Sequence, residues 1–305
     1  MLSYCEFSYF RLKVFYTVAL RLNFTKAATE LYISQPAVSK HIQELEETYK
    51  TKLFERNGSK IALTPAGKIL LKYTKSIFDI YREIDFEMSS FNSERQGLLR
   101  LGASTTISQY IISPVLARFH QKQKDIKVNL LNGNTEQIEN ALINKEIEIG
   151  IVEGQSKNQS IKYIPFLKDE LVLVCNSNNP FVKQNEISVN DLKSMKFITR
   201  ERGSGTLEVI EFALKKAGLK FSDLQIEMQL GSTESIKSYL LNSDCFAFMS
   251  IHAVSKELKN KELIVLDVEK LSIERHFYII TLLGKSDQLS ELFIQNIASH
   301  YNLKL

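Results

Sequence analysis

The most constraining feature of this sequence is the stretch from Asn23 to Arg56, where two short helical patterns are separated by a tight turn. Thr25 is expected to cap the first helix, because its hydroxyl can accept from the free amides of the following turn. Ser34 caps the second helix in the same way, and Pro36 fits its first turn, where no amide hydrogen is needed. Two helices joined by a tight turn form a helix-turn-helix, which places its second helix in the major groove of DNA.

The second helix has one apolar and one polar face. Val38, Ile42 and Leu45 recur at helical spacing and are expected to pack inward. The opposite face offers amide, hydroxyl and ammonium groups, which can bind base edges and phosphates. The residues expected to contact DNA here are Ser34, Gln35, Pro36, Ser39, Lys40 and Gln43.

A recurring set of positions within and just beyond this stretch carries a resemblance to a known family: Ala27, Ala28, Leu31, Ser34–Ser39, Ile42, Leu45, Glu46, Leu53–Arg56 and Leu63–Gly67. With these residues the chain resembles the LysR-type transcriptional regulators. The resemblance implies a winged helix-turn-helix, a long linker helix and a two-lobed α/β domain like a periplasmic binding protein, so the predicted fold class is α+β. One departure is Lys50, which stands after the recognition helix where the family usually has Gly.

Segments on both sides complete the predicted DNA-binding head. Phe10–Leu22 has apolar residues at helical spacing, and a hairpin with Asn57-Gly58 at its turn predicts a wing. From Phe10 to Pro65 the chain carries nine Lys and Arg against five Glu, an excess equal to the +4 net charge of the whole chain. Positive charge that favours phosphate is therefore concentrated in the head. Thr25, Arg56 and Lys60 are expected to contact phosphates.

A long helical pattern begins at Thr64 and Pro65. Apolar residues recur at steps of three and four as far as Phe91, a near-heptad stripe of roughly 40 Å at 1.5 Å per residue. Such a stripe either packs on its own domain or pairs with a second copy, and the resemblance favours a dimer. The predicted dimer contacts are Leu70, Tyr73, Ile77, Ile80 and Ile84.

Beyond the polar segment at Asn92–Gly97, strand and helix patterns alternate, which is typical of parallel α/β sheets. They include a predicted helix over Ile107–His120 and a predicted strand over Leu171–Cys175. The predicted division is a head over 1–64, a linker over 65–96 and an effector-binding domain over 97–305. Within that domain, the resemblance implies lobe one over 97–163 plus 272–305, and lobe two over 164–271.

Three polar loops follow strands of the two lobes, where open α/β sheets bind ligands. Arg200 and Arg202 add positive charge in the third loop, and Glu201 is the one carboxylate that these loops contribute. We therefore expect a cleft that binds a small anion. The predicted effector-binding residues are Ser104, Thr105, Thr106, Asn134, Thr199, Arg200, Arg202, Gly203, Ser204, Gly205, Thr206, Ser232 and Ser250.

The third loop also resembles the family branch that controls sulfur assimilation and carbon fixation, members of which sense small anions. Leu207 and Ile251 stand where that branch tends to have Arg. An inorganic oxyanion such as sulfite or sulfate, an organic acid, and an uncharged or zwitterionic metabolite therefore all stay open as the effector.

Other functional classes find little support. The five His residues have no Ser, Cys or carboxylate at nucleophile or metal spacing, so we expect no enzyme, metal or cofactor. Cys5, Cys175 and Cys245 are scattered, which favours idle or buried thiols.

With no signal peptide or apolar spanning run, the predicted location is the cytoplasm. A transport-type binding protein is the alternative for 97–305, and the expected partners are operator DNA, an effector, further copies of the chain, and RNA polymerase if it activates transcription.

Overall fold

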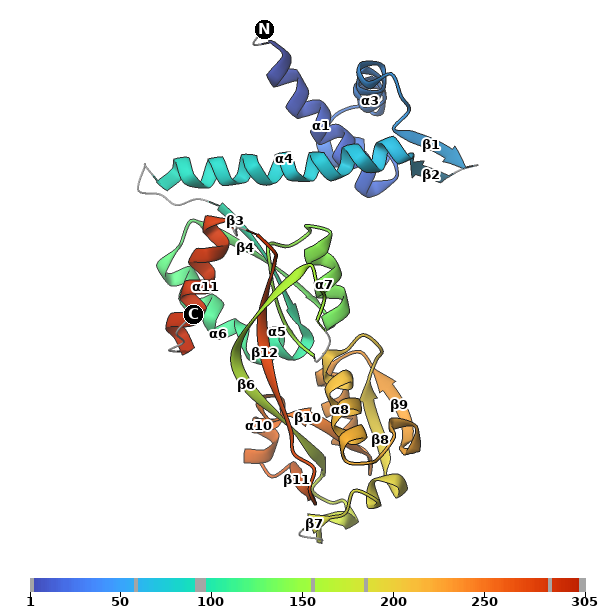
Figure 1. Ribbon diagram of the computed structural model, residues 1–305, viewed down its shortest axis with the longest axis vertical. Helices are drawn as coiled ribbons and strands as arrows, with labels where there is room; N and C mark the ends of the chain where they lie inside the picture. Colours follow the sequence, from blue (N-terminus) through green and yellow to red (C-terminus); the bar gives the residue numbers. More distant parts are fainter. Residues whose placement is uncertain are drawn as a thin grey trace. The chain divides into compact units, whose positions relative to one another are not determined.

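Residues 1–85 form the first of two units, in which helices surround a small apolar core. The computed structural model describes residues 3–57, 60–90, 97–154, 157–183, 186–284 and 287–301 (Figure 1). Val14, Phe15 and Val18 of the first helix pack against Ala27 and Ile42 in this core. The elements are α1 (Ser3–Arg21), α2 (Phe24–Leu31), α3 (Gln35–Tyr49), β1 (Phe54–Asn57), β2 (Lys60–Leu63) and α4 (Pro65–Ser90).

Two details of the head correct the sequence predictions. Helix α1 begins at Ser3, not Phe10, and the side chains of Phe10 and Leu22 are exposed instead of packed inward. Helix α2 is capped by Asn23, whose side chain accepts from the amide of Lys26, so the predicted cap at Thr25 was wrong. Asn23 is extended and stands directly before the first helical residue, which is where a cap must lie.

Two side-chain hydrogen bonds and one tight backbone contact fix the end of α3 and the start of α4 against the hairpin. Glu46 accepts from the amide of Leu53 at 2.9 Å, which ties α3 to the hairpin. The hydroxyl of Thr64 donates to the carbonyl of Lys52 at 2.7 Å. A Cβ on Gly67 would lie 2.1 Å from the carbonyl oxygen of Leu53, so only glycine fits here. The sequence predicted a hairpin here, and β1 and β2 are indeed paired antiparallel, with Phe54 opposite Leu63.

Residues 86–305 form the second unit, built on a ten-stranded sheet in the order β4-β3-β5-β12-β6-β10-β8-β9, with β11 also paired to β6 and β7 paired to β11. Helices cover this sheet at both ends (Figure 1). Its elements are β3 (Gly97–Ser104), α5 (Thr105–Tyr110), α6 (Ile112–Lys122), β4 (Ile126–Gly133), α7 (Thr135–Ile143), β5 (Ile149–Glu153), β6 (Ile161–Asn176), β7 (Glu186–Ile187), β8 (Lys196–Arg200), α8 (Gly205–Lys216), β9 (Gln225–Leu230), α9 (Thr233–Leu240), β10 (Phe246–Ser250), α10 (Ile251–Lys259), β11 (Leu263–Val268), β12 (Ile273–Leu282) and α11 (Gln288–Tyr301), with 3-10 turns at Pro180–Lys183, Asp191–Ser194 and Phe221–Asp223.

Two predicted elements differ in extent. The predicted helix over Ile107–His120 is two helices, because Pro114 in the first turn of α6 cannot continue a helix from α5. The predicted strand over Leu171–Cys175 is only the second part of β6. Pro165 lies where the pairing of β6 with β12 shifts register, which is how the sheet accommodates a proline.

Strands β6 and β12 pair along their length and pass through both lobes (Figure 1). Phe166 and Phe277 belong to an apolar cluster with β3, β5, α6 and α11. Leu171 and Ile273 belong to another cluster with β8, β10 and α8. Each of the two strands β6 and β12 therefore contributes to both apolar clusters, one in each lobe. The predicted boundary at 92–97 lies outside the described residues except for Gly97, and the predicted lobe limits stay a prediction.

No helix in the described ranges is long and apolar enough to cross a membrane. Cys175 and Cys245 are buried free thiols, and burial raises the pKa of Cys175 to about 11.

Candidate nucleic-acid interface and ligand site

Helix α3 presents its polar residues on an exposed face, while Val38, Ile42 and Leu45 are buried beneath it. The side chain of Ser34 accepts from the amide of Ala37 at 3.3 Å, so the predicted cap is present. Pro36 lies in the first turn, where its missing amide hydrogen costs nothing. The predicted contact residues Gln35, Pro36, Lys40 and Gln43 are exposed, and Ser39 is half-buried.

Two glutamine side chains on this face are already oriented. Gln35 Nε2 donates to Ser39 Oγ at 3.0 Å, and Gln43 Nε2 donates to Glu47 Oε1 at 2.9 Å. Each amide keeps a second N–H and, for Gln35, a free carbonyl oxygen, which is the donor–acceptor pair that reads adenine. The bond to Ser39 thus leaves Gln35 with a donor and an acceptor that face solvent.

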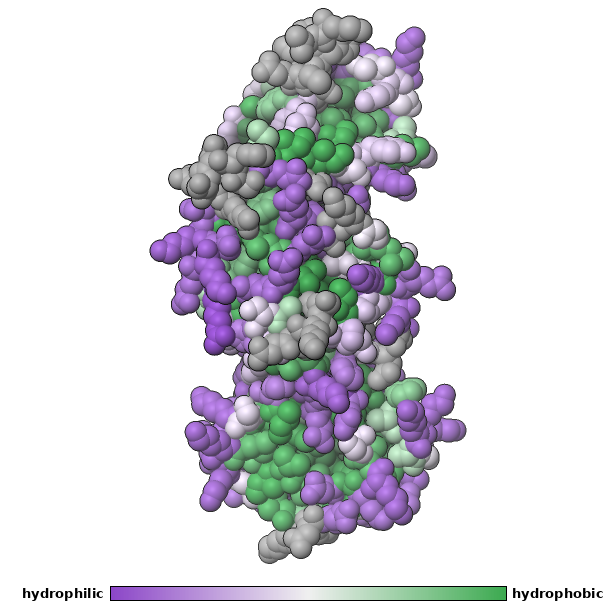
Figure 2. Space-filling model, turned by 60° about the vertical axis from the view of Figure 1, so that its left-hand side comes forward, coloured by the Kyte–Doolittle hydropathy of each residue, from purple (hydrophilic) through white to green (hydrophobic). Residues whose placement is uncertain are grey.

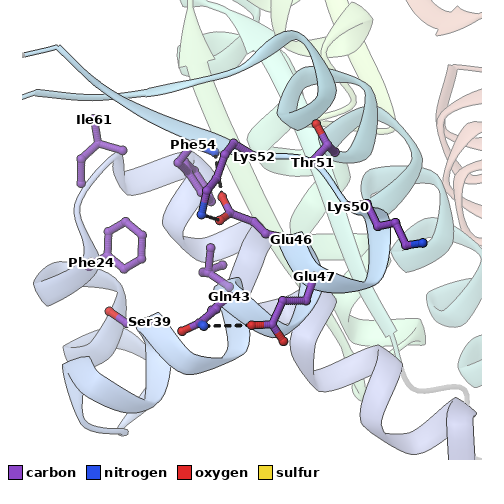
Figure 3. Close-up of a pocket in the computed structure, with 11 residues that line it drawn as sticks. Phe24, Ser39, Gln43, Glu46, Glu47, Lys50, Thr51, Lys52, Phe54 and Ile61 are labelled. Carbon is purple, nitrogen blue, oxygen red and sulfur yellow. Dashed lines mark hydrogen bonds and ion pairs between the residues drawn. The ribbon is translucent and has the colours of Figure 1, made fainter.

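An open hollow of about 650 Å³ lies between α3 and the hairpin (Figure 3). Phe24, Phe54 and Ile61 form apolar parts of its lining. Both glutamates of the rim are engaged: Glu46 receives a hydrogen bond from Lys52 at 2.7 Å, and Glu47 receives the one from Gln43. Lys50 and Lys52 also line the hollow, so its two carboxylates face two ammonium groups.

The other predicted phosphate contacts are less fully described. Thr25 is exposed on α2, where its carbonyl accepts from the hydroxyl of Thr29 at 3.1 Å. Arg56 and Lys60 lie on the paired strands β1 and β2, and their side chains lie outside what the structure describes.

In the second unit, buried hydroxyl and charged groups gather where the two lobes meet. The loops after β4 and β8 are in contact, as Asn134 Nδ2 donates to Glu201 Oε1 at 3.2 Å and to the carbonyl of Arg202 at 3.4 Å. The amide of Glu136 donates to the carbonyl of Gly203 at 3.2 Å. Buried members of the predicted effector set are Ser104, Thr105, Thr106, Thr199, Arg200, Ser204, Gly205, Thr206 and Ser250, whereas Asn134, Gly203 and Ser232 are half-buried.

Arg200 joins the lobes through its guanidinium. It makes a two-point ion pair with Glu201, Nε to Oε2 at 2.8 Å and Nη2 to Oε1 at 3.0 Å. Its nitrogens also reach Thr105 Oγ1 at 3.4 Å in lobe one and Thr233 Oγ1 at 3.5 Å in lobe two. Arg202, by contrast, has an exposed side chain and is not part of this buried group.

A second buried group centres on Arg275 of β12, which the sequence analysis did not single out. Arg275 Nε donates to Asp169 Oδ2 at 2.6 Å, and its Nη1 donates to Thr206 Oγ1 at 2.8 Å. Ser250 Oγ donates to the other oxygen of Asp169 at 2.7 Å. Glu153, at the end of β5, accepts from Ser104 and from Thr206. Glu201 is the one carboxylate of the three loops, as expected, but the strands β5 and β6 add Glu153 and Asp169 to this region.

Two donors in this region have no hydrogen-bond partner among the described residues: Arg275 Nη2 and Ser204 Oγ. Ser204 precedes α8 without capping it, so its hydroxyl is available at that helix N-terminus. The predicted site residue Ser232, in contrast, caps α9 by accepting from the amide of Ser235 at 3.4 Å. In the described part of the chain, no group of His, Cys, Asp and Glu could hold a metal ion.

Both the head and the C-terminal domain match known protein families. Residues 10–68 match the family "Bacterial regulatory helix-turn-helix protein, lysR family", and residues 92–302 match "LysR substrate binding domain". The HTH-type transcriptional regulator CysL of Bacillus subtilis is 31% identical over 295 residues, which cover 96% of this chain and 98% of CysL.

Two solved structures are similar. The regulatory domain of Synechocystis CcmR in complex with 2-PG has 29% identity and a TM-score of 0.62, covering 68% of this chain and 98% of that one. Full-length CbnR with its target DNA has 18% identity and a TM-score of 0.68, covering 95% and 99%. CbnR thus shares the fold of the full chain.

A helix-turn-helix head joined to a two-lobed α/β domain defines a DNA-binding regulator with an effector-binding domain. The chain belongs to the LysR family of transcriptional regulators, which are not enzymes.

Proposed function

We propose that this regulator reads its operator with the N-terminal half of α3. The observation that carries the proposal is the exposed polar face of α3 above a buried apolar one, with Gln35 held by Ser39. Gln35, Pro36, Ser39 and Lys40 contact base edges in this scheme, with Ser34 and Gln43 at the two ends of the face. Thr25, Arg56 and Lys60 contact phosphates. Such a regulator acts in the cytoplasm, where the chromosome is.

Replacing Gln35 by Ala tests the proposed readout. We expect a loss of roughly 1 to 3 kcal/mol at the cognate operator and a relaxed preference at one base position, because a two-point contact to a base is removed. Lys60→Ala is the matched phosphate control, and it should weaken all sequences alike. Fluorescence anisotropy at one fixed salt concentration, with the operator and its single-base variants, measures both. Unchanged base preference in Gln35→Ala would show that Gln35 does not read a base.

We also propose that a small anion binds where the lobes meet. The unpartnered donors Arg275 Nη2 and Ser204 Oγ support this, as does the N-terminus of α8, which favours negative charge. The relative CcmR, which was solved with 2-phosphoglycolate, supports the same class of ligand. Inorganic oxyanions and small organic acids both fit this chemistry.

A thermal-shift screen of the full chain tests the anion proposal. Sulfite, sulfate, phosphate and 2-phosphoglycolate are compared with uncharged glycerol at equal ionic strength. An anion present at 100 times its dissociation constant should add about 2.7 kcal/mol to the free energy of unfolding. Thr105→Val and Ser204→Ala should each reduce the shift. A response to glycerol alone, or an anion response that survives both variants, would exclude the proposed site.

The regulator is further proposed to work as a homodimer or homotetramer held by α4. Of the predicted contacts, Tyr73, Ile80 and Ile84 are exposed, whereas Leu70 and Ile77 are half-buried and Leu70 packs on the core of the head. Figure 2 shows hydrophobic residues on the surface in its upper part, where residues 1–85 lie, without separating α4 from the other helices. A regulator that activates transcription from such an operator also contacts RNA polymerase.

A further inference from the structure

Glu153 is a buried carboxylate at the end of β5 that the predicted effector set does not include. Its side chain is 2% exposed. It accepts hydrogen bonds from Ser104 Oγ and from Thr206 Oγ1, the second at 3.2 Å. Arg275 Nη1 lies 3.7 Å from Glu153 Oε1. The donors around this carboxylate therefore come from lobe one, from lobe two and from the strand that connects them.

Two of these donors belong to the predicted effector site. A serine or threonine hydroxyl has one proton to donate. While Ser104 and Thr206 donate to Glu153, neither can donate to an effector. The carboxylate of Glu153 thus accepts the two hydrogen bonds that the oxygens of a bound anion would otherwise accept.

The same region contains donors that Glu153 does not satisfy. Arg275 Nη1 donates to Thr206 Oγ1 at 2.8 Å, which fixes the guanidinium at the first turn of α8. Its Nη2 has no acceptor among the described residues, and neither does the hydroxyl of Ser204, the residue before α8. Both residues are 3% exposed, so bulk water does not readily supply the missing acceptor. Buried donors without acceptors are unfavourable, and a ligand oxygen would relieve them.

The charges of the group explain what Glu153 does to such a ligand. Asp169 already neutralises Arg275 through the 2.6 Å contact to Nε. Glu153 adds a second negative charge beside the same guanidinium. A bound anion would add a third negative charge to those of Asp169 and Glu153. Like charges in a buried site repel strongly. Anion binding is therefore opposed for as long as the Glu153 carboxylate stays beside Arg275.

We propose that Glu153 is an internal competitor of the anionic effector. The effector's oxygens bind Arg275 Nη2 and the Ser204 hydroxyl, take over the Thr206 hydroxyl, and displace the Glu153 carboxylate from it. Glu153 thereby sets the effector concentration at which the regulator responds. This inference rests on the proposed anion effector.

Isothermal titration of the full chain with sulfate, phosphate and 2-phosphoglycolate tests the proposal. Glu153→Gln keeps the size of the side chain and one acceptor oxygen but removes the charge. We expect Kd to fall at least tenfold for each anion that the wild-type protein binds. Glu146→Gln is the matched control, because it makes the same change of charge at an exposed residue of lobe one and should leave Kd unchanged.

The outcomes separate this inference from the proposal beneath it. An anion that binds wild-type and Glu153→Gln equally, or binds the variant more weakly, leaves the anion effector standing and overturns the role of Glu153. A gain that Glu146→Gln also shows is a general charge effect and overturns it too. If none of the three anions binds to either the wild-type protein or Glu153→Gln, the proposal of an anionic effector is itself excluded. Glu153→Ala, which removes the whole side chain, replaces Glu153→Gln if that variant does not fold, with the same expected gain.

Discussion

Arg200 and Glu201 are neighbours in the chain, and their side chains form a two-point ion pair within lobe two, beside lobe one. Burial acts to raise the pKa of Glu201, but the hydrogen bond and charge of Arg200, with the amide of Asn134, outweigh burial and hold this pKa below its ordinary value of 4.5. The unfolded chain therefore binds this proton more readily than the folded one. The resulting stability is complete above pH 4.5 and is lost as pH falls through the lower folded pKa.

Glu201→Gln should accordingly make the protein less stable at neutral pH, by on the order of 1 kcal/mol for a pair that is still partly exposed. It should also flatten the loss of stability between about pH 5 and pH 3, because the variant has no carboxyl to protonate. Urea unfolding at several pH values measures both effects. Glu211→Gln, at an exposed position of α8, is the control. If the pH profiles of Glu201→Gln and wild type run parallel, the ion pair does not contribute as argued.

Residue types and loop positions were enough to predict Thr105, Arg200 and Ser204 at the lobe junction, but not Asp169 and Arg275. These two lie in charged runs, Lys168–Glu170 and Glu274–His276, which read as exposed surface. A signal was nevertheless present in the alternation of the strands. Asp169 lies two residues before the buried Leu171 in β6, so both side chains point to the same face of the sheet. Arg275 shares a face in the same way with the buried Ile273 and Phe277 in β12. The contact between Asp169 and Arg275 joins residues 106 positions apart in the chain. No local sequence pattern can predict such a contact.

At the scale of elements, the turn after α3 contains a strained residue. Lys50 has φ 50° and ψ 35°, a left-handed conformation that glycine adopts without cost. Lys50→Gly should therefore raise the free energy of unfolding by about 1 kcal/mol, because it relieves this strain. Lys50→Ala removes the same charge and keeps a Cβ, so it should bring no such gain. Urea unfolding of the three proteins checks this, and equal stability of the Gly and Ala variants would contradict it.

The helices of the head and the wing were predictable because caps, proline positions and helical spacing are local signals. The full length of β6 was not, because its first part alternates imperfectly and contains Pro165. What makes that segment a strand is its pairing with β12, more than 100 positions later in the chain. The break between α5 and α6 could have been predicted from Pro114, since proline is not tolerated inside a continuous helix.

At the scale of the whole molecule, the exposed stripe of α4 predicts self-association. Ile80 is 56% exposed, whereas Ile77 is half-buried in its own unit, so Ile80 is the better position for a test. Ile80→Asp should convert the oligomer to monomers in sedimentation velocity, because an unpaired carboxylate buried in an interface costs several kcal/mol.

Lys68→Asp places the same carboxylate at an exposed position of α4 outside the stripe, and it should sediment like wild type. Each variant is also checked for an unchanged helical signal in circular dichroism. An Ile80→Asp protein that keeps the sedimentation coefficient of the wild type would exclude this stripe as the contact.

The path of the chain through β6 and β12 has a consequence for synthesis on the ribosome. The chain enters lobe two along β6 and returns along β12, so lobe two is complete in sequence before α11 has been made. Lobe one then holds β3 and β5 without Phe293 and Ile297, which close its core from α11. Domains generally fold as units as they emerge, and contacts between distant segments form late. Lobe two should therefore acquire its native packing co-translationally before lobe one, which must wait until α11 has left the ribosome.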